Sequence, residues 1–155
     1  MTRDPALLAT AIAIAARAHA GQVDKAGEDY LAHPLRVAAR VVDAGDEVVA
    51  AALLHDVLED SELTLAALSE AGLPAQVVET VDHLTRRPGE AYETAVRRAA
   101  VHPLAVIVKR ADIADNSDPA RLARLPENLR SRLQAKYARA LVIIEETPAL
   151  SDDGR

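Results

Sequence analysis

Residues 53–62, LLHDVLEDSE, carry an apolar segment into a cluster of ionisable side chains and are the most informative stretch of the chain. His55 and Glu59 are four residues apart, as are Asp56 and Asp60, so a helix places the members of each pair on one face. Burying such groups without partners is costly. A divalent cation would satisfy a histidine and a carboxylate while the other acids position a water molecule. The alternative is a solvated helix end, which the helix dipole disfavours because the acids lie near a C-terminus.

The segments on either side also have the spacing of helices. Apolar residues recur at intervals of three and four, and prolines and glycines separate the runs. Three residues have the pattern of N-caps, two of them before a proline: Asp4, His33 and Asp46. We therefore expect helices over about 5–20, 34–45, 46–58, 64–70, 74–84, 91–100, 103–116 and 127–146, with a polar loop at 21–32.

The composition favours a packed helical protein. Half of the 155 residues are apolar but only 2% are aromatic, and the chain has neither Phe nor Trp. The core must therefore be built from Leu, Val, Ile and Ala, of which Leu and Ala are strong helix formers. A chain of this length has room for one domain. We expect an all-α fold, a compact single-domain helical bundle over residues 1–147, followed by a polar tail at 148–155.

Charge and hydropathy narrow the classes of partner. The formal net charge of −6 argues against nucleic-acid binding, which needs a basic surface. An anionic substrate is still allowed, because a bound divalent cation reverses the local field. The absence of cysteine excludes disulfides and thiolate metal sites. No unbroken apolar span suits a signal peptide or a membrane helix, so we expect a soluble, cytoplasmic protein without membrane association.

A second polar cluster lies in VIVKRADIADN, residues 106–116, where Asp112 and Asn116 are four residues apart on one helix face. Taken alone, this cluster is as compatible with a solvated helix end as with a site. A single histidine such as His33 is likewise more often a cap or a loop residue than a ligand. Two imidazoles and two carboxylates together suit Mn²⁺, Fe²⁺, Mg²⁺ or Zn²⁺, with positions left for water and a phosphate oxygen. The candidate ligands are His33, His55, Asp56 and Asp112.

The order of these residues resembles the HD-domain superfamily, whose pattern is a histidine, a His-Asp pair and a distant aspartate on separate helices. A closer resemblance is to the hydrolase domain of the Rel/SpoT family and its small stand-alone versions. Those enzymes remove pyrophosphate from the 3′ position of guanosine tetraphosphate (ppGpp). The resemblance spans about residues 12–118 and is carried by AHAGQ (18–22), AHP (32–34), AALLHDVLED (51–60), VDHLT (81–85) and VKRADIADN (108–116).

The resemblance implies a role for each matching residue. One divalent metal ion, with Mn²⁺ as the first choice, would be bound by His33, His55, Asp56 and Asp112. Glu59 and Asp60 resemble the acid pair that orients and activates the attacking water. Lys25 and Asn116 resemble contacts to the substrate, with the lysine at the mouth of the nucleotide pocket.

The implied function is a metal-dependent phosphohydrolase in which an activated water attacks a phosphorylated nucleotide, ppGpp in the resembling enzymes. The family usually has two successive basic residues after the glutamine, whereas Gln22 is followed here by Val23 and Asp24. This difference leaves other phosphate esters open, such as a nucleoside monophosphate or NADPH. A non-catalytic HD scaffold that senses a ligand or contacts a protein is the alternative from another class. Such modules usually lose a ligand or the Glu-Asp pair, and this chain keeps all six residues.

Overall fold

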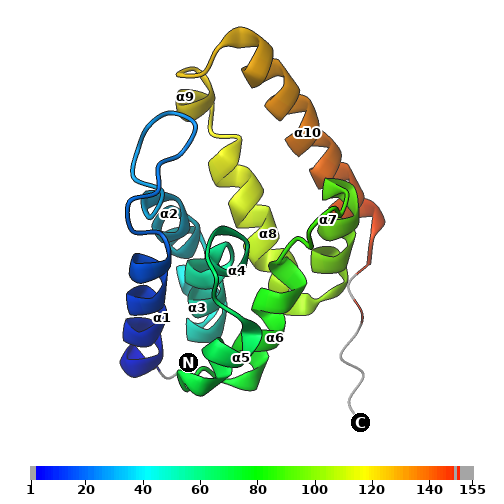
Figure 1. The fold of residues 1–155 in the computed structure, drawn as a ribbon. Coiled ribbons are helices and arrows are strands. Elements are labelled where there is room, and N and C mark those ends of the chain that lie inside the picture. The colour runs from blue at the N-terminus through cyan, green and yellow to red at the C-terminus, as the bar shows by residue number, and fades with distance from the viewer. Residues whose placement is uncertain (1–2, 149, 151–155) are drawn as a thin grey trace.

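The computed structural model describes residues 3–148 and 150, and the backbone of these residues is mainly helical (Figure 1). The helices are α1 (Pro5–Ala18), α2 (Ala32–Arg40), α3 (Asp46–Leu54), α4 (Val57–Asp60), α5 (Leu65–Glu70), α6 (Ala75–Leu84), α7 (Tyr92–Val101), α8 (Pro103–Asn116), α9 (Pro119–Leu122) and α10 (Glu127–Glu146), with a 3₁₀ turn at Val42–Ala44. Within the described residues, extended backbone pairs only in an isolated bridge between Val23 and Asp29. The expected all-α fold is confirmed.

The core consists of two clusters of aliphatic side chains. Helix α3 lies at the centre of the first cluster: its residues from Val48 to Leu54 are all buried, and α1, α2, α6 and α8 pack around it. The second cluster joins α7 and α8 to α10 and includes the fully buried Ile113 and Ile143. Helix α8 contributes to both clusters, and Figure 1 shows it running through the middle of the molecule. The position of helix α8 is therefore fixed by packing against both core clusters.

Most of the predicted helices are confirmed, and the last two long ones have the predicted bounds. Helix α1 begins as expected, because the Asp4 carboxylate accepts a hydrogen bond from the N–H of Leu7 at 3.0 Å. The short helix α9 was not predicted. None of the helices in the described part of the chain has the length and hydropathy needed to cross a membrane. The expected tail at 148–155 lies outside the described residues except for Pro148 and Leu150.

The prediction that His33 caps a helix over 34–45 is wrong. Helix α2 begins at Ala32, so His33 lies in its first turn. Pro34 is tolerated there because the first four N–H groups of a helix have no acceptor within it. The helix ends at Arg40, and the backbone turns through a short 3₁₀ segment before α3.

The prediction that Asp46 is an N-cap is also wrong. Asp46 is the first residue of α3, and the cap position belongs to Gly45, whose φ of 109° favours glycine. The Asp46 carboxylate instead accepts hydrogen bonds from the Arg3 side chain and from the backbone N–H of Asp4. It therefore ties the start of α3 to the start of α1.

The helix predicted over 46–58 is divided in two, since α3 ends at Leu54 and the one-turn helix α4 follows after a two-residue turn. Nδ1 of His55 donates to the carbonyl oxygen of Ala52 at 2.6 Å. A continuous helix would give that acceptor to the N–H of Asp56. Successive residues of an unbroken helix point about 100° apart, so the break allows the side chains of His55 and Asp56 to face one centre.

Candidate metal centre

Three segments that are far apart in the sequence meet at one point: the first turn of α2, the junction of α3 and α4, and the inward face of α8. They bring together the four predicted ligands, His33, His55, Asp56 and Asp112. Three of them are buried, with no more than 6% of the residue exposed, and Asp56 is half-buried. Polar groups buried in this way need strong partners.

The nitrogen and oxygen atoms through which these side chains would bind a metal lie close together. Nε2 of His33 lies 3.2 Å from Nε2 of His55 and 3.0 Å from Oδ1 of Asp112. Oδ2 of Asp56 lies 3.0 Å from Nε2 of His55 and 3.6 Å from Nε2 of His33. Ligand atoms about 2.1 Å from a common ion, at tetrahedral or octahedral angles, are roughly 3.0–3.4 Å apart. His33, His55 and Asp112 form a buried group whose ligand atoms all lie within 4.8 Å of one another and could hold one divalent ion, and Asp56 contacts both histidines of that group.

Hydrogen bonds on the far side of each imidazole determine where its lone pair points. Nδ1 of His55 must donate, because its partner is the carbonyl oxygen of Ala52. Nδ1 of His33 donates to the carboxylate of Asp115 at 2.7 Å. In the neutral rings both Nε2 atoms then carry lone pairs on the side of the carboxylates of Asp56 and Asp112. Such an arrangement of acceptors needs a cation or protons between them, and its chemistry fits a metal ion.

Asp115 orients His33, a role that the sequence reasoning missed. Its carboxylate is 1% exposed and also accepts hydrogen bonds from Arg36 at 2.9 and 3.1 Å and from Arg121 at 2.7 Å. Burial raises the pKa of Asp115, but the hydrogen bonds from His33 and Arg36 outweigh burial and lower the pKa to about 2. A carboxylate behind a ligand histidine fixes the ring and increases its basicity. The available signal was the three-residue spacing from Asp112 on α8.

The carboxylates also control the proton affinity of the two imidazoles. Burial lowers the pKa of His33, but hydrogen bonds with Asp112 and Asp115 outweigh burial and raise the pKa above its usual 6.5. Burial acts in the same direction on His55, but the charge of Asp56 and a hydrogen bond that His55 donates to Asp112 outweigh burial and raise its pKa well above 6.5. The site thus attracts positive charge strongly, whether from protons or from a metal ion.

The predicted acid pair lies beside this cluster. Glu59 lines a recess of about 150 Å³ together with Asp56 and Asp112. Its Oε1 accepts a hydrogen bond from the backbone N–H of Arg86 at 2.6 Å. Burial is the main cause that raises the pKa of Glu59. Asp60 is absent from the described lining of that recess, and burial followed by the charge of Asp56 raises its pKa.

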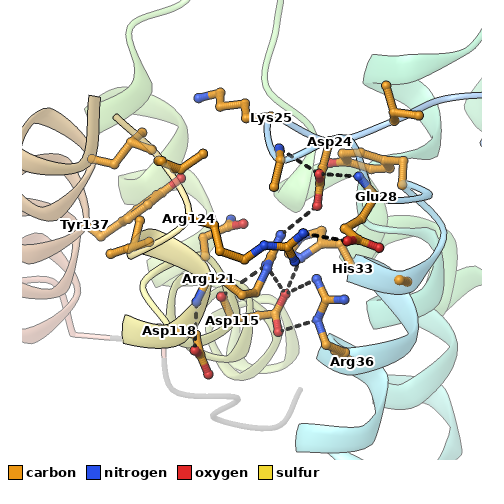
Figure 2. A pocket seen from close by; sticks show the side chains of 18 of the residues that line it. Asp24, Lys25, Glu28, His33, Arg36, Asp115, Asp118, Arg121, Arg124 and Tyr137 are labelled. Atoms are coloured by element: carbon orange, nitrogen blue, oxygen red, sulfur yellow. Dashed lines mark hydrogen bonds and ion pairs between the residues drawn. The ribbon is translucent and has the colours of Figure 1, made fainter. Parts of the chain in front are cut away.

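The predicted substrate contacts line a larger cavity of about 830 Å³, whose lining also includes His33 (Figure 2). Asn116 lines both cavities, and its Nδ2 donates to Oδ1 of Asp112 at 2.9 Å. Figure 2 shows Lys25 apart from the network of ion pairs in this cavity. Tyr30, which was not predicted, lines both cavities and donates to Oδ2 of Asp56 at 2.6 Å. Tyr30 and Asn116 therefore stand between the two cavities.

Replacement of Asp115 by asparagine should weaken Mn²⁺ binding about 10- to 100-fold, because the neutral amide is a poorer acceptor for Nδ1–H of His33. Isothermal titration calorimetry of the metal-free protein measures this affinity. Glu93→Gln is the matched control, since Glu93 pairs with Arg97 at the surface, and its affinity should stay within about twofold of the unchanged protein. Equal affinities in Asp115→Asn and the unchanged protein would rule out the orienting role.

Binding of Mn²⁺ should release protons. The pKa values of His33 and His55 are raised in the metal-free protein, and each ring must lose a proton before its Nε2 binds a metal. A raised pKa keeps the proton bound to higher pH, so metal affinity should increase as pH rises above 6.5 and decrease below it. Calorimetric titrations in buffers of different ionisation enthalpy count the released protons. An affinity that is constant between about pH 6 and pH 8, without proton release, contradicts this expectation.

Comparison with known proteins places this geometry in a family. A family model described as "HD domain" matches residues 11–115. The guanosine-3′,5′-bis(diphosphate) 3′-pyrophosphohydrolase of Aquifex aeolicus is 34% identical over 107 residues, which cover 63% of this chain and 15% of that protein. The enzyme of the same name from Haemophilus influenzae is 43% identical over 75 residues, 47% of this chain and 11% of that protein. The chain therefore spans only a small part of the length of these relatives.

A solved structure shares the fold over almost the whole chain. It is a metazoan orthologue of SpoT, described as hydrolysing ppGpp and as playing a role in starvation responses. The TM-score is 0.77 at 22% sequence identity, and the match covers 96% of this chain and 91% of that chain. The family match covers residues 11–115 and includes all four candidate ligands, and on that ground the chain belongs to the HD-domain family.

Proposed function

We propose that this chain is a divalent-metal-dependent phosphohydrolase that acts on a phosphorylated nucleotide. The proposed metal is Mn²⁺ and the proposed ligands are His33, His55, Asp56 and Asp112. The observation that carries the proposal is the convergence of four side chains: the two imidazole Nε2 atoms lie 3.2 Å apart, and each lies 3.0–3.6 Å from a carboxylate oxygen of Asp56 and of Asp112. A mixed set of imidazoles and carboxylates suits ions such as Mn²⁺. When bound there, the ion would polarise a phosphoryl oxygen and lower the pKa of a water molecule.

The relatives support hydrolysis of a phosphate ester or anhydride as the type of reaction. The Aquifex aeolicus and Haemophilus influenzae proteins are named as 3′-pyrophosphohydrolases of guanosine-3′,5′-bis(diphosphate). The family-model match over residues 11–115 contains all four candidate ligands. We therefore propose the same class of reaction here, with ppGpp as the first substrate to test.

Glu59 is the best-placed residue to take a proton from the attacking water. Its carboxylate lines the recess that also contains Asp56 and Asp112. The N–H of Arg86 holds Oε1, and Oε2 has no hydrogen bond within the described part of the chain. Burial raises the pKa of Glu59, which brings it closer to the pH at which a general base works best. The charge of Asp60 contributes to the same shift, and we assign Asp60 that supporting role.

The larger cavity is suited to the nucleoside part of the substrate. Its volume of about 830 Å³ lies within the range of pockets that bind nucleotide-sized ligands. Asn116 stands between this cavity and the metal centre, and Lys25 lies in its lining on the loop between α1 and α2. We propose that both residues contact the substrate: Asn116 near the reacting phosphate and Lys25 at the entrance.

Substitutions of the proposed metal ligands and of Glu59 should have different effects on metal binding and on proton transfer. His55→Ala and Asp112→Ala should each abolish both Mn²⁺ binding and hydrolysis, whereas Glu59→Gln should keep the metal and lower kcat about 10²- to 10⁴-fold. Pyrophosphate and phosphate release from ppGpp, NADPH and a nucleoside monophosphate, followed with the Mn²⁺-loaded protein, measures the activity. Glu70→Gln, at an exposed position on α5, is the matched control and should keep full activity. Turnover that persists in His55→Ala, or purified protein that does not bind Mn²⁺, would refute the proposal.

A further inference from the structure

The lysines of this chain all line the two cavities next to the candidate metal centre. Of the 18 lysine and arginine residues only three are lysines, namely Lys25, Lys109 and Lys136. Lys25 lines the larger cavity, and the other two line the recess beside the candidate ligands. Lysine is a compact, mobile point charge and a common ligand of phosphate. Their shared position therefore points to an anionic ligand.

Lys136 of α10 is held at the recess by aromatic rings rather than by an acid. Its Nζ lies 4.1 Å from the ring centroid of Tyr92 and 5.6 Å from that of Tyr137. Nζ of Lys109 lies 5.3 Å from the same Tyr92 ring, but Lys109 is also paired with Asp112 at 2.8 Å. No carboxylate within the described residues lies within 4 Å of Lys136. Its positive charge is therefore available to a ligand.

Arg86 supplies a second available cation on the same side. Its Nε donates to the carbonyl oxygen of Glu90 at 2.7 Å, and within the described residues it forms no ion pair. Burial lowers the pKa of Lys136, and the neighbouring charges of Lys25, Lys109 and Arg86 lower it further. Cationic side chains that form no ion pair of their own within the described residues, such as Lys136 and Arg86, are stabilised when an anion binds between them.

The size of the recess limits what that anion can be. At about 150 Å³ the recess is smaller than the pockets of roughly 300–1,000 Å³ that enclose organic ligands. It holds Asp56 and Asp112 of the metal centre as well as Arg86 and Lys136. An anion bound in the recess would therefore be adjacent to the phosphate that reacts at the metal. A phosphate next to the reacting phosphate satisfies both conditions.

The larger cavity has the opposite character, because its arginines are already paired with acids (Figure 2). The pairs are Arg36 with Asp115, Arg40 with Asp115 and Asp118, Arg121 with Asp24 and Asp115, and Arg124 with Glu28. Among the cationic side chains described in this cavity, only Lys25 forms no ion pair. The cavity therefore has little unpaired charge to offer a second phosphate chain.

Asp24 is one of the acids that neutralise the arginines of the larger cavity. Its Oδ1 accepts the N–H groups of Ala26 and Glu28 at 2.8 and 3.0 Å, and its Oδ2 accepts from Arg121 at 3.1 Å. Burial raises the pKa of Asp24, and these hydrogen bonds outweigh burial and lower it, so the group is ionised. The residue that departs from the family pattern thus both shapes the loop and occupies a cation that a polyphosphate would otherwise use.

We propose that the recess beside Lys136 and Arg86 is a second phosphate subsite, and that the larger cavity takes the uncharged nucleoside part of the substrate. This inference rests on the proposed function and narrows its substrate class to nucleotides with one diphosphate arm directed toward α10. The oxygen of water bonds to the phosphorus next to the sugar, and the bond from that phosphorus to the sugar oxygen breaks. The sugar oxygen gains the proton that the water loses, and pyrophosphate leaves as a unit.

The test compares two inorganic probes on the Mn²⁺-loaded protein at constant free Mn²⁺. Pyrophosphate should bind at least about tenfold more tightly than orthophosphate, because it reaches both the metal and the subsite. Lys136→Met should lower pyrophosphate affinity about tenfold and orthophosphate affinity by less than about threefold, and Lys136→Arg should restore most of the difference. Calorimetric titration measures both affinities, and Arg86→Gln provides a second variant with the same expectation.

Arg110→Met is the matched control, because Arg110 is an exposed residue of α8 that is paired with Glu145 and lies outside the described linings of both cavities. It removes the same charge and should leave both affinities unchanged. If Mn²⁺ and orthophosphate bind but pyrophosphate binds equally in Lys136→Met, Arg86→Gln and the unchanged protein, the subsite is refuted and the proposed function stands. If neither Mn²⁺ nor either anion binds to the unchanged protein, the proposed function fails as well.

Discussion

The Nε2 atoms of two imidazoles and two carboxylates meet at one buried point, and this arrangement constrains the rest of the structure. Unprotonated Nε2 atoms 3.2 Å apart, each 3.0–3.6 Å from two carboxylates, are unfavourable unless positive charge lies between them. Hydrogen bonds behind the two imidazoles fix the direction of both rings. The Ala52 carbonyl and Asp115 hold the protons of the rings on the far side, so that both Nε2 atoms face the centre. The break between α3 and α4 directs His55 and Asp56 together.

The helical fold could largely be predicted from the sequence, because its signals are local. Apolar spacing and prolines are enough to locate α8 and α10, and the absence of large aromatic residues leaves a core of small aliphatic side chains. The break after Leu54 could not be predicted in this way. It depends on a ring-to-backbone hydrogen bond of His55, and the residues around it keep the composition of a continuous helix. The position of His33 inside α2 was missed because Pro34 is tolerated in any first turn.

The site could be predicted in part. The spacing of the acids and the resemblance to the HD superfamily singled out the residues that the fold brings together at the centre. The supporting residues depend on contacts that have no local signal: His33 and Asp115 are 82 residues apart. Lys136 lies beyond the region that the family model matches, on a helix whose pattern indicates only packing. Substrate preference is therefore the property least accessible from the sequence, since it depends on which cations remain unpaired after folding.

The central claim is that one divalent ion binds where these four side chains meet. Anomalous diffraction from crystals grown with Mn²⁺, recorded near the manganese absorption edge, tests it most directly. The account predicts one strong anomalous peak about 2.0–2.3 Å from Nε2 of His33, Nε2 of His55 and the carboxylate oxygens of Asp56 and Asp112. A peak bound to other residues, or no peak at this centre while the crystals contain Mn²⁺, would contradict it.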